Sequence, residues 1–294
     1  MSLSWRDRLQ IFFAPGQVSI TRFPKGLHYR APKNGRLNYS WPKSKALTTI
    51  SAVCHEKPGK VLWASPLEEL ERCLDGVRGA EAVITISNHF VRYSVLPAQK
   101  DITNPAELNT YAEFHMREVF GERVAAWILS VGAWDPCYGG VCAAVDRELF
   151  EQLDELATRC KVRLQYIEPY LTSAFDGFRK RFLDARSWFA VVEEGRLCLV
   201  LLEDGAWRHI RNRRIAHDIN DELLAALDQE AILFPGSKGV AGTVYLLAPA
   251  YPELILPEGC GWRIIWLQAG PMAAPSNVRA LPGPDEASTC AASG

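Results

Sequence analysis

One local pattern recurs at widely separated places in the chain: two apolar, strand-like runs divided by a short turn. The pattern occurs at residues 11–23, 83–97 and 188–202. Apolar runs separated by a few turn-forming residues are typical of β-hairpins. A strand meander near the start and another near residue 190 predict two α/β halves of similar build, which meet face to face and leave a cleft for a ligand.

Helix signals lie between these units. A capping residue followed by an amphipathic run predicts helices that begin after Ser65, Asn104 and Asp146. Residues 218–232 are predicted to form a further amphipathic helix. Further strands are predicted at residues 46–54, 125–133, 140–145, 162–167, 207–215, 243–247 and 263–267. The chain breaks at Pro169, so we expect a first lobe over residues 1–168 and a second over 169–269. Residues 270–294 are rich in Ala, Pro, Gly and Ser, which predicts a disordered tail.

Composition excludes several functional classes. The net charge of −1 over 294 residues gives no broad field that would attract nucleic acid. No apolar run approaches the roughly 20 residues that a membrane-spanning helix needs, and the first residues lack the apolar core of a signal peptide, so we expect a cytoplasmic protein. Cys137 and Cys142 form only half of a zinc site. The sequence therefore predicts no metal site.

The strand–turn–strand patterns that open the two halves resemble those that open each half of proteins with the actin-like ATPase fold. Residues 87–97, Ser-Asn-His-Phe-Val-Arg-Tyr-Ser-Val-Leu-Pro, resemble a segment of two families with this fold. These are the PilM-type proteins of type IV pilus assembly and the cytoplasmic domain of the type II secretion L protein. The resemblance covers residues 9–268 and implies an actin-like (RNase H-like) two-lobed α/β fold with two mixed sheets.

The resemblance also implies where a nucleotide would bind. Members that bind nucleotide carry an Asp-x-Gly turn in the first hairpin of each half, and the matching positions here include one glycine in the first turn and three residues in the second. These candidate cofactor-binding residues are Gly16, Glu193, Glu194 and Gly195.

Both turns depart from the family pattern. The first turn has no carboxylate, and Pro15 lacks an N–H that could face a phosphate. The family's late Gly-Gly turn is replaced by Ala248-Pro249. Because Mg²⁺-bound phosphates need carboxylate oxygens together with turn amides, these departures predict a protein without catalytic residues and without a nucleotide cofactor.

The resemblance to PilM implies a binding role. It predicts a cytoplasmic scaffold, peripheral to the inner membrane, that binds the cytoplasmic tail of a PilN-like inner-membrane protein in a pilus or secretion assembly. The candidate partner-binding residues are Ser87, Asn88, His89 and Arg92. Ser87 and His89 could also be imagined as part of a catalytic set, but nothing in the sequence orients the imidazole, and turn chemistry explains them.

Other interpretations stay open. An active actin-like ATPase or kinase would use Glu193, Glu194 and Gly195 to hold ATP and Mg²⁺. An unrelated α/β enzyme is a third possibility. The basic run at residues 208–214 is expected to be a strand with a solvated face, and a contact with anionic lipid or with an acidic partner tail is the alternative.

Overall fold

A computed structural model describes residues 7–23, 48–55, 57–234 and 242–268. It contains two five-stranded sheets and one three-stranded sheet. The order of the first large sheet is β3-β2-β1-β4-β8, and that of the second is β11-β10-β9-β12-β13. In each sheet the first three strands are antiparallel neighbours, and the two later strands run parallel to the first. The predicted repetition is therefore present in the strand topology.

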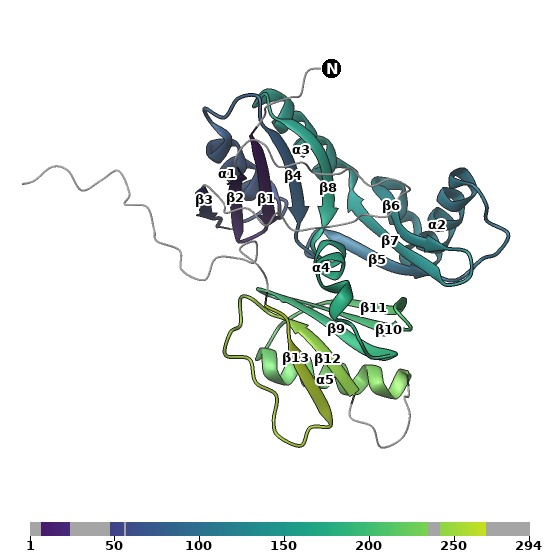
Figure 1. Cartoon of the computed structure of the whole chain (residues 1–294). Helices are drawn as coiled ribbons and strands as arrows, with labels where there is room; N and C mark the ends of the chain where they lie inside the picture. The colour runs from purple at the N-terminus through teal and green to yellow at the C-terminus, as the bar shows by residue number, and fades with distance from the viewer. Residues whose placement is uncertain (1–6, 24–47, 56, 235–241, 269–294) are drawn as a thin grey trace, which may run out of the picture.

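The first part of the chain forms the first large sheet, the helices on it and the three-stranded sheet (Figure 1). Its large sheet and its two covering helices are β1 (Arg8–Ala14), β2 (Gln17–Phe23), β3 (Thr48–Val53), α1 (Ala64–Leu74), β4 (Glu81–Ile86), α3 (Arg147–Arg159) and β8 (Arg163–Pro169). Between β4 and α3 the chain adds β5 (Val91–Leu96), α2 (Pro105–Phe120), the short helix η1 (Gly121–Ala126), β6 (Trp127–Asp135) and β7 (Gly139–Asp146). These strands form the separate sheet β5-β7-β6.

The second large sheet follows a short connection. The connection consists of α4 (Tyr170–Phe178) and η2 (Arg179–Arg181), and α4 lies between the two large sheets in Figure 1. The remaining elements are β9 (Arg186–Glu193), β10 (Arg196–Glu203), β11 (Ala206–Arg214), α5 (Ile219–Leu233), β12 (Gly242–Leu247) and β13 (Trp262–Trp266). The predicted tail at residues 270–294 lies outside the described residues.

The prediction of a hairpin at residues 83–97 is wrong. Both strands exist, but β4 pairs with β1 and β8, whereas β5 pairs with β7 in another sheet. The reason is that the intervening turn continues the pairing of the first sheet, because the N–H of Ser87 donates to the carbonyl oxygen of Phe13 at 2.8 Å. The chain then passes from one sheet to another instead of folding back on itself.

Two of the three predicted helix caps, Asn104 and Asp146, are confirmed, and the helix predicted at residues 218–232 is α5, which begins after Asp218. The side chains of Asn104, Asp146 and Asp218 each accept backbone N–H groups in the first turn of α2, α3 and α5. Ser65 does not cap α1, because the helix begins at Ala64 and Ser65 is buried within its first turn. Pro66 is tolerated there because the first N–H groups of a helix have no acceptor inside the helix.

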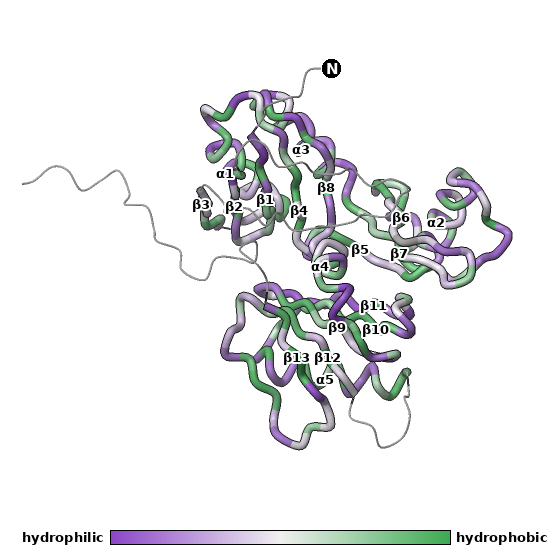
Figure 2. The backbone as a smooth tube through the Cα atoms, viewed as in Figure 1, coloured by the Kyte–Doolittle hydropathy of each residue, from purple (hydrophilic) through white to green (hydrophobic). Residues whose placement is uncertain are grey.

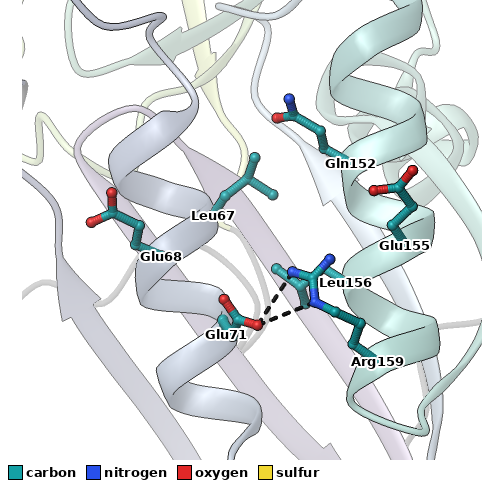
Figure 3. A pocket seen from close by; sticks show the side chains of 7 residues that line it. All are labelled: Leu67, Glu68, Glu71, Gln152, Glu155, Leu156 and Arg159. Carbon is teal, nitrogen blue, oxygen red and sulfur yellow. Dashed lines mark hydrogen bonds and ion pairs between the residues drawn. The ribbon is translucent and has the colours of Figure 1, made fainter.

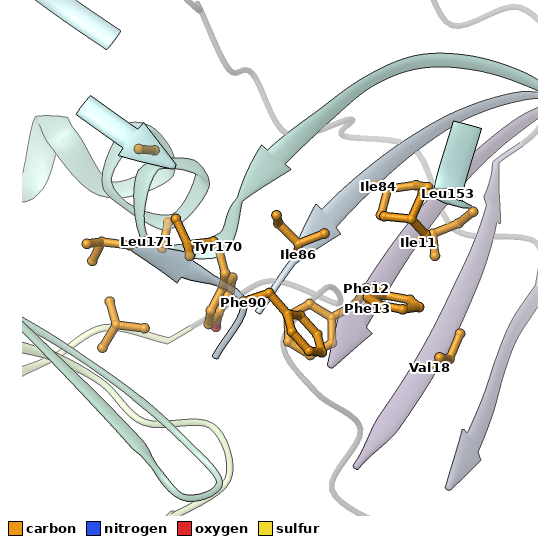
Figure 4. Packing of buried hydrophobic residues seen from close by; sticks show 14 of the residues in the cluster. Ile11, Phe12, Phe13, Val18, Ile84, Ile86, Phe90, Leu153, Tyr170 and Leu171 are labelled. Carbon is orange, nitrogen blue, oxygen red and sulfur yellow. The ribbon is translucent and has the colours of Figure 1, made fainter. Parts of the chain in front are cut away.

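Most of the apolar core is continuous across both large sheets. One buried cluster joins the first sheet to α4 and to one face of the second sheet, and Figure 4 shows part of it where Phe90 lies beside Phe13, with ring centroids 5.5 Å apart. The other face of the second sheet packs on α5. Its central strands are therefore buried on both faces, which explains their nearly unbroken apolar sequence and their hydrophobic colour in Figure 2.

Candidate functional site

Three turns from distant parts of the chain meet between the two large sheets. They are the β1–β2 turn with Gly16, the turn at residues 87–90 after β4, and the β9–β10 turn with Glu194 and Gly195. A Cβ atom on Gly16 would lie 3.9 Å from Oε2 of Glu194, and one on Gly195 would lie 3.7 Å from Cε1 of His89. We call this meeting point the interlobe junction.

A backbone-to-carboxyl bond closes the interlobe junction. The N–H of Asn88 donates to Oε2 of Glu193 at 3.0 Å, and both residues are buried. Beside it, Nε2 of His89 donates to the carbonyl oxygen of Glu194 at 2.8 Å. Each bond links the turn after β4 to the β9–β10 turn, so the two halves are fastened directly to one another.

The side chain of Asn88 organises the inner part of the junction. Its Oδ1 accepts the hydroxyl of Tyr93 at 2.6 Å and the N–H of Leu171 at 3.1 Å, which ties the turn to β5 and to the start of α4. Asn212 on β11 donates through Nδ2 to the carbonyl oxygens of Asn88 at 2.9 Å and Val91 at 3.0 Å. Buried polar groups need such partners, and these bonds join the turn to β5, α4 and β11.

Burial changes the ionisation of the junction. Desolvation raises the pKa of Glu193 to about 7, although hydrogen bonds from Ser87 and Asn88 act in the opposite direction. Burial also raises the pKa of Tyr93 and of Cys198. Around neutral pH a large share of the Glu193 carboxyl is therefore protonated, which is unusual for a glutamate and is a consequence of its position between the sheets.

The structure brings together all four candidate cofactor-binding residues. The donor set for a magnesium–phosphate group is short, because the β1–β2 turn brings no carboxylate to the junction and Oε2 of Glu193 accepts the N–H of Asn88. Since burial raises the pKa of Glu193 to about 7, a cation would also have to compete with a proton for this carboxyl near neutral pH. No cluster of three or more His, Cys, Asp or Glu side chains with the arrangement of a metal site occurs within the described residues. The hydrogen bonds of this junction attach the two halves to one another.

The candidate partner-binding residues differ in accessibility. Ser87 and Asn88 are both 0% exposed, whereas His89 is half-buried and Arg92 is exposed. Ser87 makes the expected turn bond, since its Oγ accepts the N–H of His89 at 3.2 Å. Partner binding by these residues stays a prediction, and with this geometry a partner could touch the side chains of only His89 and Arg92.

Sequence reasoning missed Asn212 and Tyr93 as parts of the junction. Asn212 is the single amide side chain within an arginine-rich strand, which is a weak but readable signal. Tyr93 has no such signal, because an aromatic residue in an apolar strand is ordinarily a core residue.

A second buried acid, Glu168, accepts the hydroxyls of Thr85 at 2.9 Å and Ser173 at 2.8 Å and holds α4 to the first sheet.

A separate small cavity of about 150 Å³ lies between α1 and α3 (Figure 3). Its floor is apolar, with Leu67 and Leu156, and its rim is mostly acidic. Across it, Oε1 of Glu71 accepts from Nη2 of Arg159 at 3.2 Å. This cavity is lined by helix residues on the face of the first sheet and shares no residue with the interlobe junction.

Two large sheets of the same strand order, joined at an interlobe junction, define an actin-like ATPase fold, and solved structures bear this out. The cytoplasmic domain of EpsL, an inner-membrane component of the type II secretion system of Vibrio cholerae, superposes with a TM-score of 0.55 at 10% identity over 90% of both chains. A structure of the PilM–PilN type IV pilus biogenesis complex gives a TM-score of 0.59 at 13% identity, over 90% of this chain and 88% of that one.

A protein of unknown function from Bacteroides thetaiotaomicron, described as having an actin-like ATPase fold, gives a TM-score of 0.53 at 12% identity, over 83% and 82% of the two chains. The fold and the resemblance predicted from the sequence are thus confirmed in three dimensions. No protein-family model matches the sequence, and no curated protein matches it.

Among the residues that the structure describes, no helix has the length and apolar character needed to cross a membrane.

Proposed function

We propose that this chain is a non-catalytic cytoplasmic scaffold of a type IV pilus or type II secretion-like assembly. Its fold is shared with the EpsL cytoplasmic domain and with a PilM–PilN complex over about nine tenths of the chain. The proposed partner is the cytoplasmic tail of an inner-membrane protein of the PilN type, which would keep the chain peripheral to the inner membrane. We further propose lobes at residues 1–168 and 169–269, and no nucleic-acid partner.

The bond between Asn88 and Glu193 is the observation that carries the non-catalytic part of the proposal. In relatives that bind nucleotide, acids of the two turns serve metal and phosphate. In this chain Ala14 stands beside the first turn, where those relatives have an acid, and Glu193 beside the second turn accepts the N–H of Asn88. A junction whose one carboxyl is already hydrogen-bonded to the protein supports a role in binding a partner rather than in hydrolysing ATP.

A pull-down tests the binding part. The full chain is incubated with an immobilised N-terminal tail peptide of the inner-membrane pilus or secretion protein encoded beside it, and retention is expected. His89→Ala and Arg92→Ala are expected to weaken retention, and Arg78→Ala serves as a control at an exposed surface position. Absence of retention for every such tail would contradict the proposal.

Calorimetry with ATP and Mg²⁺ tests the alternative, an active ATPase or kinase. The alternative draws on Glu193, Glu194 and Gly195, which do lie opposite Gly16 in the structure. The scaffold proposal expects no heat of binding at micromolar ATP. Binding that Glu193→Ala abolishes, while the control Glu113→Ala on α2 leaves it intact, would establish the alternative.

A further inference from the structure

Three arginines gather beside the interlobe junction. Arg196 at the start of β10 stands directly opposite Arg214 at the end of β11. Arg92 follows Val91 on β5, and the bond from Asn212 to the Val91 carbonyl fixes β5 against β11 two residues from Arg214. After desolvation, the charges of Arg92 and Arg214 are among the causes that lower the pKa of Arg196. We call this group the arginine cluster.

The other arginines of β11 have carboxylate partners. Arg208 pairs with Glu203 at 3.4 Å, Arg211 with Glu230 at 3.3 Å, and Arg213 with Glu222 at 3.0 Å. Each of these guanidinium groups is therefore neutralised by an acid of a neighbouring element, so β11 as a whole does not present a continuous positive surface.

The members of the arginine cluster have no such ion-pair partner. Within the described part of the chain, none of them forms an ion pair with a carboxylate. Nη1 of Arg92 donates to the backbone carbonyls of His89 at 3.4 Å and Val91 at 3.2 Å. The ionised share of Glu193 raises the pKa of Arg196, but Oε2 of Glu193 accepts from Asn88 and forms no ion pair with that guanidinium.

The cluster is accessible and incompletely bonded. Arg92 and Arg214 are exposed, and Arg196 is half-buried with its Nε buried and without a hydrogen-bond partner. Like charges placed directly opposite on neighbouring strands are destabilising, and a buried donor without a partner adds to that cost. An anion between the guanidinium groups would relieve both.

We propose that Arg92, Arg196 and Arg214 form a binding site for the carboxylates of an acidic peptide segment on a partner protein. Guanidinium groups bind carboxylates through paired N–H groups. A membrane surface is less well matched, because lipid recognition ordinarily uses clusters of roughly 4–8 basic residues. This proposal extends the proposed function. It depends on that function in one respect, namely that the chain has a protein partner.

Fluorescence anisotropy with the full chain tests this site. The probe is a fluorescein-labelled peptide of alternating Glu and Ser, and the same peptide with Lys in place of Glu is the probe control. We expect the acidic peptide to bind and the basic one not to bind. Arg92→Gln and Arg214→Gln are each expected to weaken binding about tenfold, whereas Arg208→Gln, an exposed arginine on the same strand that has Glu203 as its partner, is expected to leave it unchanged.

Two further ligands distinguish other sources of the anion. Vesicles of phosphatidylcholine and phosphatidylglycerol, and inorganic pyrophosphate, are titrated in parallel, with circular dichroism to verify that each variant is folded. Binding of vesicles or pyrophosphate without binding of the acidic peptide would overturn the proposal, and so would equal losses in Arg208→Gln and Arg214→Gln. If the inner-membrane tail is not retained in the pull-down but the acidic peptide binds in the anisotropy experiment, the PilN-like partner is rejected and the arginine site is kept.

Discussion

The β1–β2 turn and the β9–β10 turn hold equivalent positions in two sheets of the same strand order. The last paired residues are Ala14 and Gln17 in the first and Glu193 and Arg196 in the second, so each turn has two residues and ends in glycine. The two turns have the same length, but the flanking side chains are those of Ala14 and Gln17 in the first and those of the acid Glu193 and the cation Arg196 in the second.

The two turns contribute unequally to the interlobe junction. The β9–β10 turn provides two acceptors, the carboxyl of Glu193 and the carbonyl of Glu194. The first half provides the two donors, the N–H of Asn88 and the ring of His89. The β1–β2 turn lies next to the β9–β10 turn, with Gly16 near the side chain of Glu194. The shared strand order therefore fixes where the two turns lie, while the two residues that flank each turn decide which groups that turn can bind.

The largest effect is expected from Asn88→Ala. The substitution removes the acceptor for Tyr93 and Leu171 and leaves two buried donors without partners, so the free energy of unfolding should fall by about 3–4 kcal/mol. Urea denaturation measures the change. Asn104→Ala, which removes an exposed helix cap, is the comparison, with an expected loss of about 1 kcal/mol. A smaller loss for Asn88→Ala than for Asn104→Ala would mean that the junction does not hold the halves together.

The next effect concerns pH. Burial raises the pKa of Glu193 from its ordinary value of 4.5 to about 7, so between these values the folded chain holds a proton that the unfolded chain has released. This stabilising contribution is fully present below pH 4.5 and is lost as the pH rises through 7, and the free energy of unfolding should fall by about 3 kcal/mol on that account.

Glu193→Gln isolates this contribution, because the amide keeps the size of the side chain and cannot titrate. Urea denaturation of both proteins between pH 4.5 and 8 should show the difference between them growing in favour of the variant as the pH rises. Asp176, whose pKa burial raises to about 6, titrates equally in both and cancels. Parallel pH profiles of the wild type and Glu193→Gln would contradict a Glu193 carboxyl whose pKa is raised by burial.

The smallest effect compares the two turn glycines directly. Gly195 has φ of +72°, and Gly16 does not have a positive φ. Gly195→Ala should lower the free energy of unfolding by about 1–2 kcal/mol, and Gly16→Ala by less than about 0.5 kcal/mol, since its new Cβ would only contact Oε2 of Glu194. Thermal denaturation can rank the two variants, and an equal loss in both would show that the turns are not as different as their backbones indicate.

Much of the fold could be predicted because its signals are local. The caps at Asn104, Asp146 and Asp218 and the glycine after α2 act within one helical turn, so their residues alone fix where helices begin and end. Residues 83–97 show the limit, because strand character is local but the choice of partner strand is not. Ser87 bonds to Phe13, more than seventy positions earlier in the chain, and that contact cannot be seen in the turn's own residues.

The candidate site shows the same division. The family resemblance selected Gly16, Glu193, Glu194 and Gly195, and the structure brings them together. It could not select Asn212 or Tyr93, whose roles depend on which strands face the turn. It also could not foresee the pKa of Glu193, because desolvation depends on what covers a side chain.

Residue type and short-range spacing fix most of the helices and strands of this protein, the recurrence of its strand meander, and the absence of a carboxylate from the first turn. Packing of the sheets is needed to bring Asn88 to Glu193, to divide residues 83–97 between two sheets, and to set Arg196 opposite Arg214. Those features arise from contacts between residues far apart in the chain, which are set when the sheets pack.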